Sequence, residues 1–471
     1  MNVQKQLLAA VVVAGASMLG TTTAYAQDNR STDQRLADIE AVLAPWQELM
    51  QGLSMGGSLR IRTEYRDPFS YSTGAAAGVS EDITLMRTRF HMNFDMGEHL
   101  ETRIEFQDSR TWGDGSSFMS DSEQVDLSEG YITFKRMQDC SLLDCLPEDW
   151  DLSMRAGRQR LPDFGDQRVI SSLDWSNVGN AFDGLHVVLD GDAFQADIIV
   201  AQLLEDSTAS GSGHDNELTG LYVTTDRVPN TNIDVYAFLL HFGDDSIIGE
   251  NAVAGDLDQR TFGARADHTI DLEDVGTVKA TVEYVIQNGD SSDDDIDASA
   301  YAAEVTYQMP EDGALPWMPS VTIGTTFASG DGSGTDGDQE TFMPIAPYGH
   351  AYQGHMDFFA WQNGTDTYLK VAASPCAGTT IHADYHMFSL DEEADAWYSA
   401  SGSVIRPGAA TADDEIGSEI DIYVKYGNER MKLWTGWSHF MDGDFVDDTG
   451  GGSSGDFFFF QIEVFFGAKD T

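Results

Sequence analysis

Four arginines, Arg155, Arg158, Arg160 and Arg168, fall within 14 residues of a polar stretch of this chain. A guanidinium group presents its N–H donors as a fork, which can hold a carboxylate through two parallel hydrogen bonds. Several such groups on the wall of a narrow aqueous passage, bounded by material of low dielectric constant, would concentrate anions there. The spacing therefore predicts a site that attracts carboxylated solutes.

Basic residues are concentrated in the first third of the chain, although the net charge of the whole chain is −53. Thirteen of the 26 Lys and Arg residues lie between positions 60 and 168. Arg60 and Arg62 alternate with Leu59 and Ile61. If these residues form a strand of a membrane barrel, an arginine that faces lipid at the bilayer midplane destabilises the fold by about 2–4 kcal/mol. We therefore expect a positive inner wall. The predicted pore-lining, anion-binding residues are Arg60, Arg62, Arg87, Arg89, Arg103, Arg155, Arg158, Arg160 and Arg168.

A neutral arrangement of the same arginines is the alternative, because carboxylates on neighbouring strands could pair with them. The candidates for such a ladder are Glu64, Asp95, Glu101, Glu105, Glu129 and Asp166. Arg158 and Arg160 also lie on the opposite face of their strand from Arg155. They reach the interior only if the strand bulges at Gly157 or ends at the loop that follows.

The elements that position these arginines are predicted to be strands, because the sequence alternates with a period of two from Gly56 to Gly467. Long connections rich in Gly, Ser and Asp alternate with tight turns, which is typical of a transmembrane β-barrel. The predicted fold is all-β, a transmembrane antiparallel barrel of about eighteen strands. The predicted strands are 56–66, 83–96, 99–110, 125–136, 150–161, 180–190, 192–205, 216–226, 232–243, 257–269, 276–289, 297–308, 320–329, 365–374, 379–390, 415–426, 430–442 and 456–467.

The loop 161–179 is predicted to fold inward and to narrow the passage. Its candidate constriction residues are Asp166, Asp174, Trp175 and Asn177. The loop 330–364 is the longest of the predicted long connections.

Residues 1–26 have a basic start, an apolar core and Ala24-Tyr25-Ala26, so they are predicted to be a cleaved signal peptide. Residues 27–55 are predicted to hold a short periplasmic helix, and residues 56–467 the barrel. Cys140 and Cys145 are spaced to form a disulfide in an oxidising compartment. The predicted location is the outer membrane of a Gram-negative type of cell envelope.

Other chemistry is less well supported. The strong negative charge argues against nucleic acid as a partner, and no catalytic or cofactor motif is present, so no enzyme and no cofactor are predicted. Asp331, Asp336 and Asp338 are separated by glycines and could ligate a structural Ca²⁺. Solvated acidic loops explain the same pattern.

Two groups of motifs resemble the alginate-export family of outer-membrane barrels. The first group is Gly157-Arg158-Gln159, Gly165-Asp166, Asp174-Trp175-Ser176-Asn177 and Phe182-Asp183-Gly184. The second is Gly330-Asp331, Thr341-Phe342, Tyr348-Gly349-His350, Tyr352-Gln353-Gly354, Asp357, Asn363 and Ala383-Asp384-Tyr385-His386. The resemblance implies an eighteen-stranded barrel that conducts an anionic polysaccharide or a related solute past arginines at a constriction.

The sequence thus predicts a passive outer-membrane channel for carboxylated solutes, with alginate as one candidate polysaccharide. Its expected partners are outer-membrane lipid and the solute, and no periplasmic partner is identified. One alternative is a plugged structural or adhesive surface barrel with calcium-binding loops. Another is a secreted β-rich enzyme that is not attached to the membrane.

Overall fold

The computed structural model describes residues 52–68, 71, 79–113, 125–139, 147, 150–203, 216–311, 313, 315 and 317–468, together with Ala41. The predicted signal peptide, most of the segment 27–55 with its predicted helix, and the predicted Cys140–Cys145 disulfide lie outside these residues. Among the described residues, no helix is long and apolar enough to cross a membrane.

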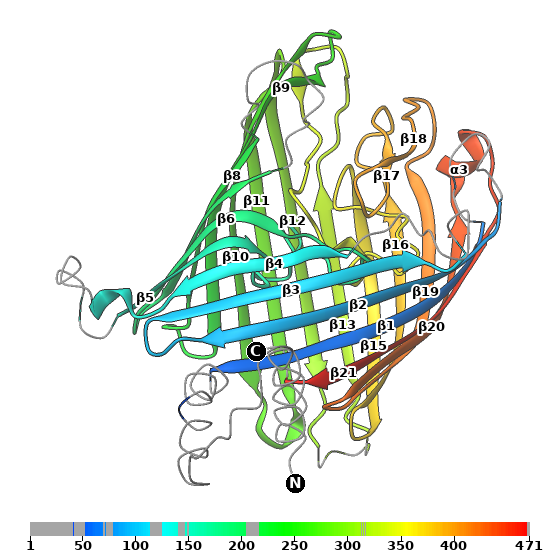
Figure 1. The fold of residues 1–471 in the computed structure, drawn as a ribbon. Coiled ribbons are helices and arrows are strands. Elements are labelled where there is room, and N and C mark those ends of the chain that lie inside the picture. Colours follow the sequence, from blue (N-terminus) through cyan, green and yellow to red (C-terminus); the bar gives the residue numbers. More distant parts are fainter. Residues whose placement is uncertain are drawn as a thin grey trace, which may run out of the picture. The chain divides into compact units, whose positions relative to one another are not determined.

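Eighteen antiparallel strands close into a barrel, because β1 pairs with β2 on one side and with β21 on the other (Figure 1). The barrel strands are β1 (Leu53–Asp67), β2 (Glu81–Asp95), β3 (Leu100–Thr111), β4 (Asp126–Phe134), β5 (Asp151–Gln159), β6 (Phe182–Asp190), β7 (Gln195–Gln202), β8 (Glu217–Thr225), β9 (Thr231–Ile248), β10 (Ala254–Asp271), β11 (Thr277–Ser291), β12 (Asp294–Gln308), β13 (Ser320–Ala328), β15 (Gly364–Cys376), β16 (Thr379–Ser389), β19 (Glu415–Gly427), β20 (Met431–Asp442) and β21 (Gly455–Gly467). The predicted barrel of eighteen strands is confirmed.

The remaining short elements lie in the connections between barrel strands. They are η1 (Met137–Asp139), η3 (Glu273–Val275), β14 (Asp338–Gln339), η4 (Gly349–Ala351), β17 (Trp397–Tyr398), β18 (Val404–Arg406) and α3 (Asp444–Asp448). The two-residue β14 runs parallel to the start of β12 and does not contribute to closure of the barrel.

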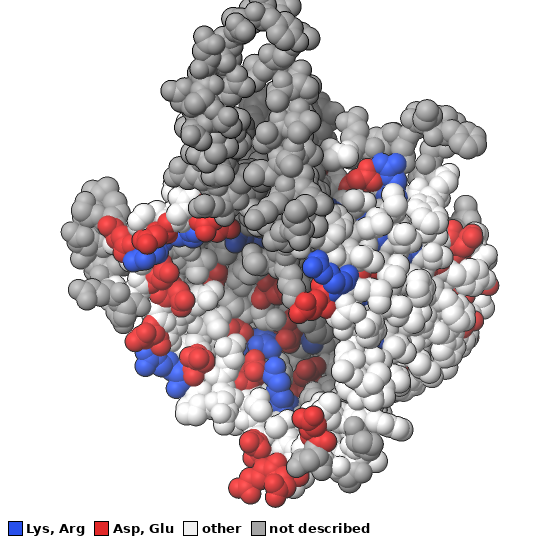
Figure 2. Space-filling model, turned by 60° about the horizontal axis from the view of Figure 1, so that its bottom comes forward, with Lys and Arg blue, Asp and Glu red and all other residues white. Residues whose placement is uncertain are grey.

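The lipid-facing side of the strands is apolar, as the membrane requires, and charged side chains face in together with buried aromatic residues such as Phe457 and Phe459. On β21, Phe458 and Phe460 are each 48% exposed, whereas Gln461 and Glu463 are buried. Figure 2, which brings the tight-turn end forward, shows charged side chains inside the hollow and around the rim, while the broad wall at the right is almost free of them. Closure leaves no unpaired strand edge in the lipid.

The connections depart from strict long–short alternation at both ends of the barrel. At the long-loop end, residues 292–293 alone connect β11 and β12, and at the tight-turn end residues 309–319 connect β12 and β13. Strands β9 and β10 extend to Ile248 and Ala254, well beyond the predicted limits of 243 and 257, so their connection is short although it lies at the long-loop end. Figure 1 shows these strands rising above their neighbours. At the tight-turn end, residues 135–150 make a long connection between β4 and β5.

Two loops enter the barrel and pack against its inner wall. We call residues 160–181, between β5 and β6, the constriction loop, and residues 329–363, between β13 and β15, the long loop. They meet at a parallel bridge between Ile170 and Ala346, where the N–H of Ala346 donates to the carbonyl of Val169 at 2.9 Å. Side chains of both loops fill two buried apolar clusters against the strands. The interior is therefore narrowed by packed loops.

Candidate pore constriction

Arg60 of β1 holds the tip of the constriction loop by its main chain. Its guanidinium group donates to the carbonyls of Asp174 at 2.6 Å, Trp175 at 3.2 Å and Ser176 at 2.8 Å. The residue is only 2% exposed, so these bonds satisfy donors that water cannot reach. From β2, Arg87 donates to the carbonyls of Asp174 and Ser176 at 3.1 and 3.3 Å. The two arginines clamp the loop tip to the wall.

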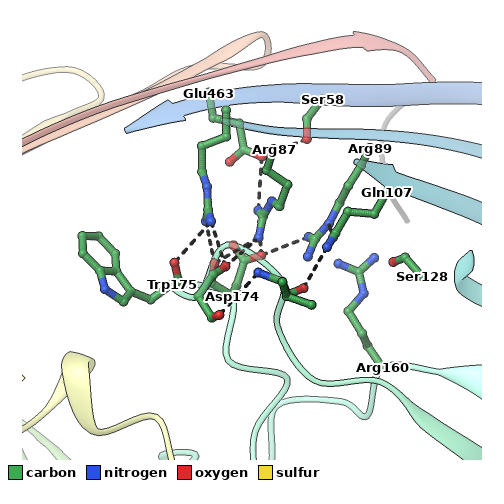
Figure 3. Close-up of polar contacts among 12 residues, drawn as sticks. Ser58, Arg87, Arg89, Gln107, Ser128, Arg160, Asp174, Trp175 and Glu463 are labelled. Carbon is green, nitrogen blue, oxygen red and sulfur yellow. Dashed lines mark hydrogen bonds and ion pairs between the residues drawn. The ribbon is translucent and has the colours of Figure 1, made fainter. Parts of the chain in front are cut away.

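Asp174 lies at the centre of this positive group (Figure 3). Its Oδ1 is 2.9 Å from Arg87 and 3.0 Å from Arg89, and its side chain is 57% exposed. Partial burial raises the pKa of Asp174, but Arg87, Arg89, Arg60 and Arg160 outweigh this effect and lower the pKa to about 2. A carboxylate placed at this point is therefore strongly stabilised by its surroundings.

Arg103 and Arg160 belong to a second, more nearly neutral group. Arg103 is 2.6 Å from Glu105 and 2.7 Å from Glu129. Arg160 is 3.1 Å from Glu105 and 2.8 Å from Glu129. Here the structure brings two of the six carboxylates of the neutral-ladder alternative, Glu105 and Glu129, together with predicted arginines. The predicted arginines thus divide between the two interpretations.

Arg160 reaches this group because β5 ends at Gln159, which is one of the two routes that the sequence allowed. The other route is absent, because the register of β4 and β5 passes Gly157 without a shift. Arg158 instead pairs with Asp183 at 2.8 Å, and its side chain is 41% exposed.

Arg155 and Arg168 lie apart from the loop tip. Arg155 stacks on the ring of Tyr131 at 4.4 Å. Arg168 is 5% exposed and lies 4.3 Å from the ring of Tyr352, so it packs the constriction loop against the long loop. Asp166 bonds Arg265 of β10 at 2.8 Å. Arg168 and Asp166 thus anchor the loop on the side opposite Asp174, whereas Arg155 contacts the neighbouring strand β4.

Aromatic and charged side chains join the two loops near Trp175. The indole of Trp175 lies between the guanidinium of Arg62, 3.7 Å away, and the imidazole of His350, also 3.7 Å away and nearly parallel to it. His350 Nδ1 is 2.8 Å from Asp357, which is 3.3 Å from Arg66. Asn177 completes the loop tip by donating to the carbonyl of Met86 at 3.2 Å. Sequence reasoning missed Arg66, whose strand phase is the same as that of Arg60 and Arg62.

The junction of the two loops is expected to loosen in acid. Burial lowers the pKa of His350 to about 4, against the opposing effect of Asp357. In an opened loop the imidazole regains a pKa near 6.5. Between about pH 6.5 and pH 4 the opened form therefore binds a proton, whereas the packed form stays neutral. The packed junction is thus fully stable above about pH 6.5 and loses up to about 3 kcal/mol as the pH falls to about 4. Single-channel current noise should rise over this range, and the same onset in His350→Gln would contradict the assignment.

The three aspartates predicted to bind calcium lie in the long loop, and two of them accept hydrogen bonds from its own backbone. Asp331 accepts from the N–H of Ser333 at 2.8 Å, and Asp336 accepts from the N–H of Asp338 at 3.2 Å. In the described part of the chain, no group of three or more His, Cys, Asp and Glu residues is placed to hold a metal ion. Calcium binding stays a prediction.

The chain belongs to the alginate export family, whose model matches residues 51–460. This match covers the whole barrel apart from the end of β21 and places the protein in the outer membrane. Comparison with curated proteins gave no match.

Solved structures with the same fold are outer-membrane barrels. The outer membrane protein OprD from Pseudomonas aeruginosa matches with a TM-score of 0.58 at 10% identity, covering 88% of this chain and 94% of that one. OccAB4 from Acinetobacter baumannii has a TM-score of 0.57 at 12% identity, with 88% and 98% covered. OpdO from Pseudomonas aeruginosa has a TM-score of 0.56 at 12% identity, with 90% and 100% covered. The likeness establishes a porin-like barrel.

Proposed function

We propose that this outer-membrane protein is a passive channel that prefers anions and conducts a carboxylated solute, with an anionic polysaccharide such as alginate as the leading candidate. The proposal makes the protein a conduit rather than an enzyme. It draws on the family's role in alginate export and on the charge of the constriction.

The observation that carries the proposal is the environment of Asp174. Four guanidinium groups lower the pKa of this exposed carboxyl to about 2, in a chain whose net charge is −53. A permeating carboxylate that passes the loop tip would meet the same positive potential, because the potential acts on any negative charge there. Fixed guanidinium groups also require no reorganisation when the solute arrives.

A second candidate function is a plugged barrel with a structural or adhesive role. It is favoured by the packing of the two inward loops, which join at the Ile170–Ala346 bridge and bury residues such as Phe342 and Trp361 inside the barrel. A plugged barrel would carry no current. Conductance of the folded protein in a planar bilayer therefore separates the two candidates.

Asp174→Asn is expected to increase anion preference by about threefold, measured as the permeability ratio from the reversal potential in a KCl gradient at low salt. A unit charge about 6 Å from a permeating ion contributes about 0.7 kcal/mol even in a water-like medium, and low salt limits screening. The backbone carbonyls of residue 174 and Ser176 still hold the loop tip in this variant.

Asp163→Asn is the matched control, because Asp163 is an exposed aspartate in the same loop with no ion pair among the described residues. It should shift the permeability ratio less than Asp174→Asn. Cation preference in the wild-type channel, or equal shifts in both variants, would overturn the proposal. A folded barrel that carries no current would support the plugged alternative.

A further inference from the structure

Two lysines on the inner wall, one in β15 and one in β19, form no ion pair with a carboxylate among the described residues. Lys370 of β15 lies 4.6 Å from the ring of Tyr368 and donates to the carbonyl of Tyr352 at 3.3 Å. Lys425 of β19 lies 4.2 Å from the ring of Trp434 and 5.2 Å from that of Tyr423. Aromatic faces hold both ammonium groups in place without cancelling their charge.

The strand register shows that both lysines face the interior. Lys425 lies opposite Trp434, Trp434 opposite Gln461, and Gln461 opposite Arg62, so the four form one row across β19, β20, β21 and β1. Gln461 and Arg62 are buried inside the barrel, whereas Lys425 is exposed to the aqueous lumen. On β15, Leu369 and Val371 at 44% and 40% exposure flank Lys370 on the opposite, lipid-facing side.

A third nitrogen group lies between the two lysines. His382 of β16 is opposite Tyr423 in the register and stacks on its ring at 4.4 Å, with an angle of 7° between the planes. The imidazole is half-buried and forms no hydrogen bond with any described residue. Asp384, opposite Lys370, accepts instead from the hydroxyl of Tyr423 at 3.0 Å. This hydrogen bond leaves Asp384 charged, and its carboxylate acts on both lysines from a distance. Two ammonium groups facing one carboxylate still leave the cluster with a net positive charge.

The contrast with the arginines is what makes these groups informative. Arg60 and Arg87 donate hydrogen bonds to the main chain of the loop tip, and Arg103 is paired with Glu105 and Glu129. Their charge raises the local potential, but their donors are occupied. Lys370 and Lys425 can still donate hydrogen bonds to an incoming anion.

We propose that Lys370, His382 and Lys425 form a binding site for a carboxylate group of the conducted solute, on the periplasmic side of the constriction. Lys425 lies two residues before β19 ends at Gly427, at the tight-turn end that faces the periplasm. Trp434 lies between this site and the constriction loop. Its ring packs edge-on against that of Trp175, with 4.9 Å between the ring centroids. The solute class rests on the proposed function.

The test is block of the channel current by a hexuronate oligomer of about six sugars, added to each side of the bilayer in turn. Replacing both lysines, Lys370→Gln with Lys425→Gln, is expected to weaken block from the periplasmic side by about tenfold or more, because two charge-assisted hydrogen bonds are lost. A neutral oligosaccharide of the same length should distinguish charge recognition from simple obstruction. Heat-dependent migration on a gel verifies that each variant is folded.

Lys279→Gln is the control, because Lys279 also lies near the tight-turn end but is paired with Asp267 at 3.4 Å. It should leave the block unchanged. Equal block of the wild type and the double variant would overturn the lysine site while leaving anion preference intact. An anion-preferring channel that hexuronate does not block would overturn the site together with the carboxylate class. Cation preference in the wild type would overturn the proposed function itself.

Discussion

Replacing Arg60 and Arg87 together with alanine is expected to release the constriction loop and at least double the single-channel conductance. The two side chains donate five hydrogen bonds to the main chain of Asp174, Trp175 and Ser176. A buried carbonyl that has lost its hydrogen-bond donor destabilises the packed loop by about 1–3 kcal/mol. The loop tip therefore lowers its free energy by leaving the wall, where water can bond its carbonyls. The open level should also fluctuate, because a freed loop moves on the nanosecond-to-microsecond scale.

Arg155→Ala is the matched control for this experiment. Arg155 lies on the same inner wall but stacks on Tyr131 and forms no hydrogen bond to the loop tip among the described residues. Its loss should leave the conductance close to that of the wild type. Unchanged conductance in the double variant, with the barrel shown to be folded, would mean that contacts such as Arg62 with Trp175 hold the loop without the clamp.

The barrel itself could be predicted from the sequence because the membrane imposes one simple rule on every strand. Leu59 and Phe458 must face lipid and Arg60 and Gln461 must not, so the alternation is visible in the residues. The limits of β9 and β10 were harder to place, since their ends extend beyond the part of the barrel where alternation is enforced. The lumen-facing phase of Arg60, Arg62, Arg87, Arg89 and Arg103 follows from the same rule.

The partners of the arginines could not be predicted, because they depend on where two loops fold. Alternation places Arg60 inside the barrel but does not say that it meets the carbonyl of Asp174, 114 residues away in sequence. Nor does it show that Arg168 packs on Tyr352 of another loop. Lys370 and Lys425 were overlooked for a related reason. Counting Lys and Arg along the sequence draws attention to dense clusters. Whether a basic side chain can bind an anion depends instead on the carboxylates that surround it in the folded protein.

Asn363 is the residue whose loss is expected to disturb the long loop most. It is fully buried at the end of this loop, and its side chain forms three hydrogen bonds to the main chain of the connection between β16 and β19. Its Oδ1 accepts from the N–H of Glu392 at 2.9 Å, and its Nδ2 donates to the carbonyls of Glu392 and Ala396 at 3.0 Å each. Its φ of 41° is also one that asparagine tolerates better than most residues.

Asn363→Ala is expected to increase cleavage by chymotrypsin after Trp397 and Tyr398 by about a hundredfold. Leaving three backbone groups without partners costs on the order of 3 kcal/mol or more, and cleavage follows the population of the opened connection. Trp397 is 1% exposed in the packed form, so cleavage there requires opening. Gly330→Ala should act similarly, because a Cβ at residue 330 would lie 1.8 Å from the Asn363 Oδ1.

Asn428→Ala supplies the comparison, since Asn428 also forms three side-chain hydrogen bonds but lies exposed in the tight turn between β19 and β20. Water replaces its bonds, so cleavage after Trp397 should not change. If Asn363→Ala were cleaved no faster than Asn428→Ala, the two connections would be held together by their apolar contacts. In that case the long loop would be kept inside the barrel by the buried pair Trp397 and Phe358. The indole N–H of Trp397 donates to the carbonyl of Phe358 at 2.5 Å.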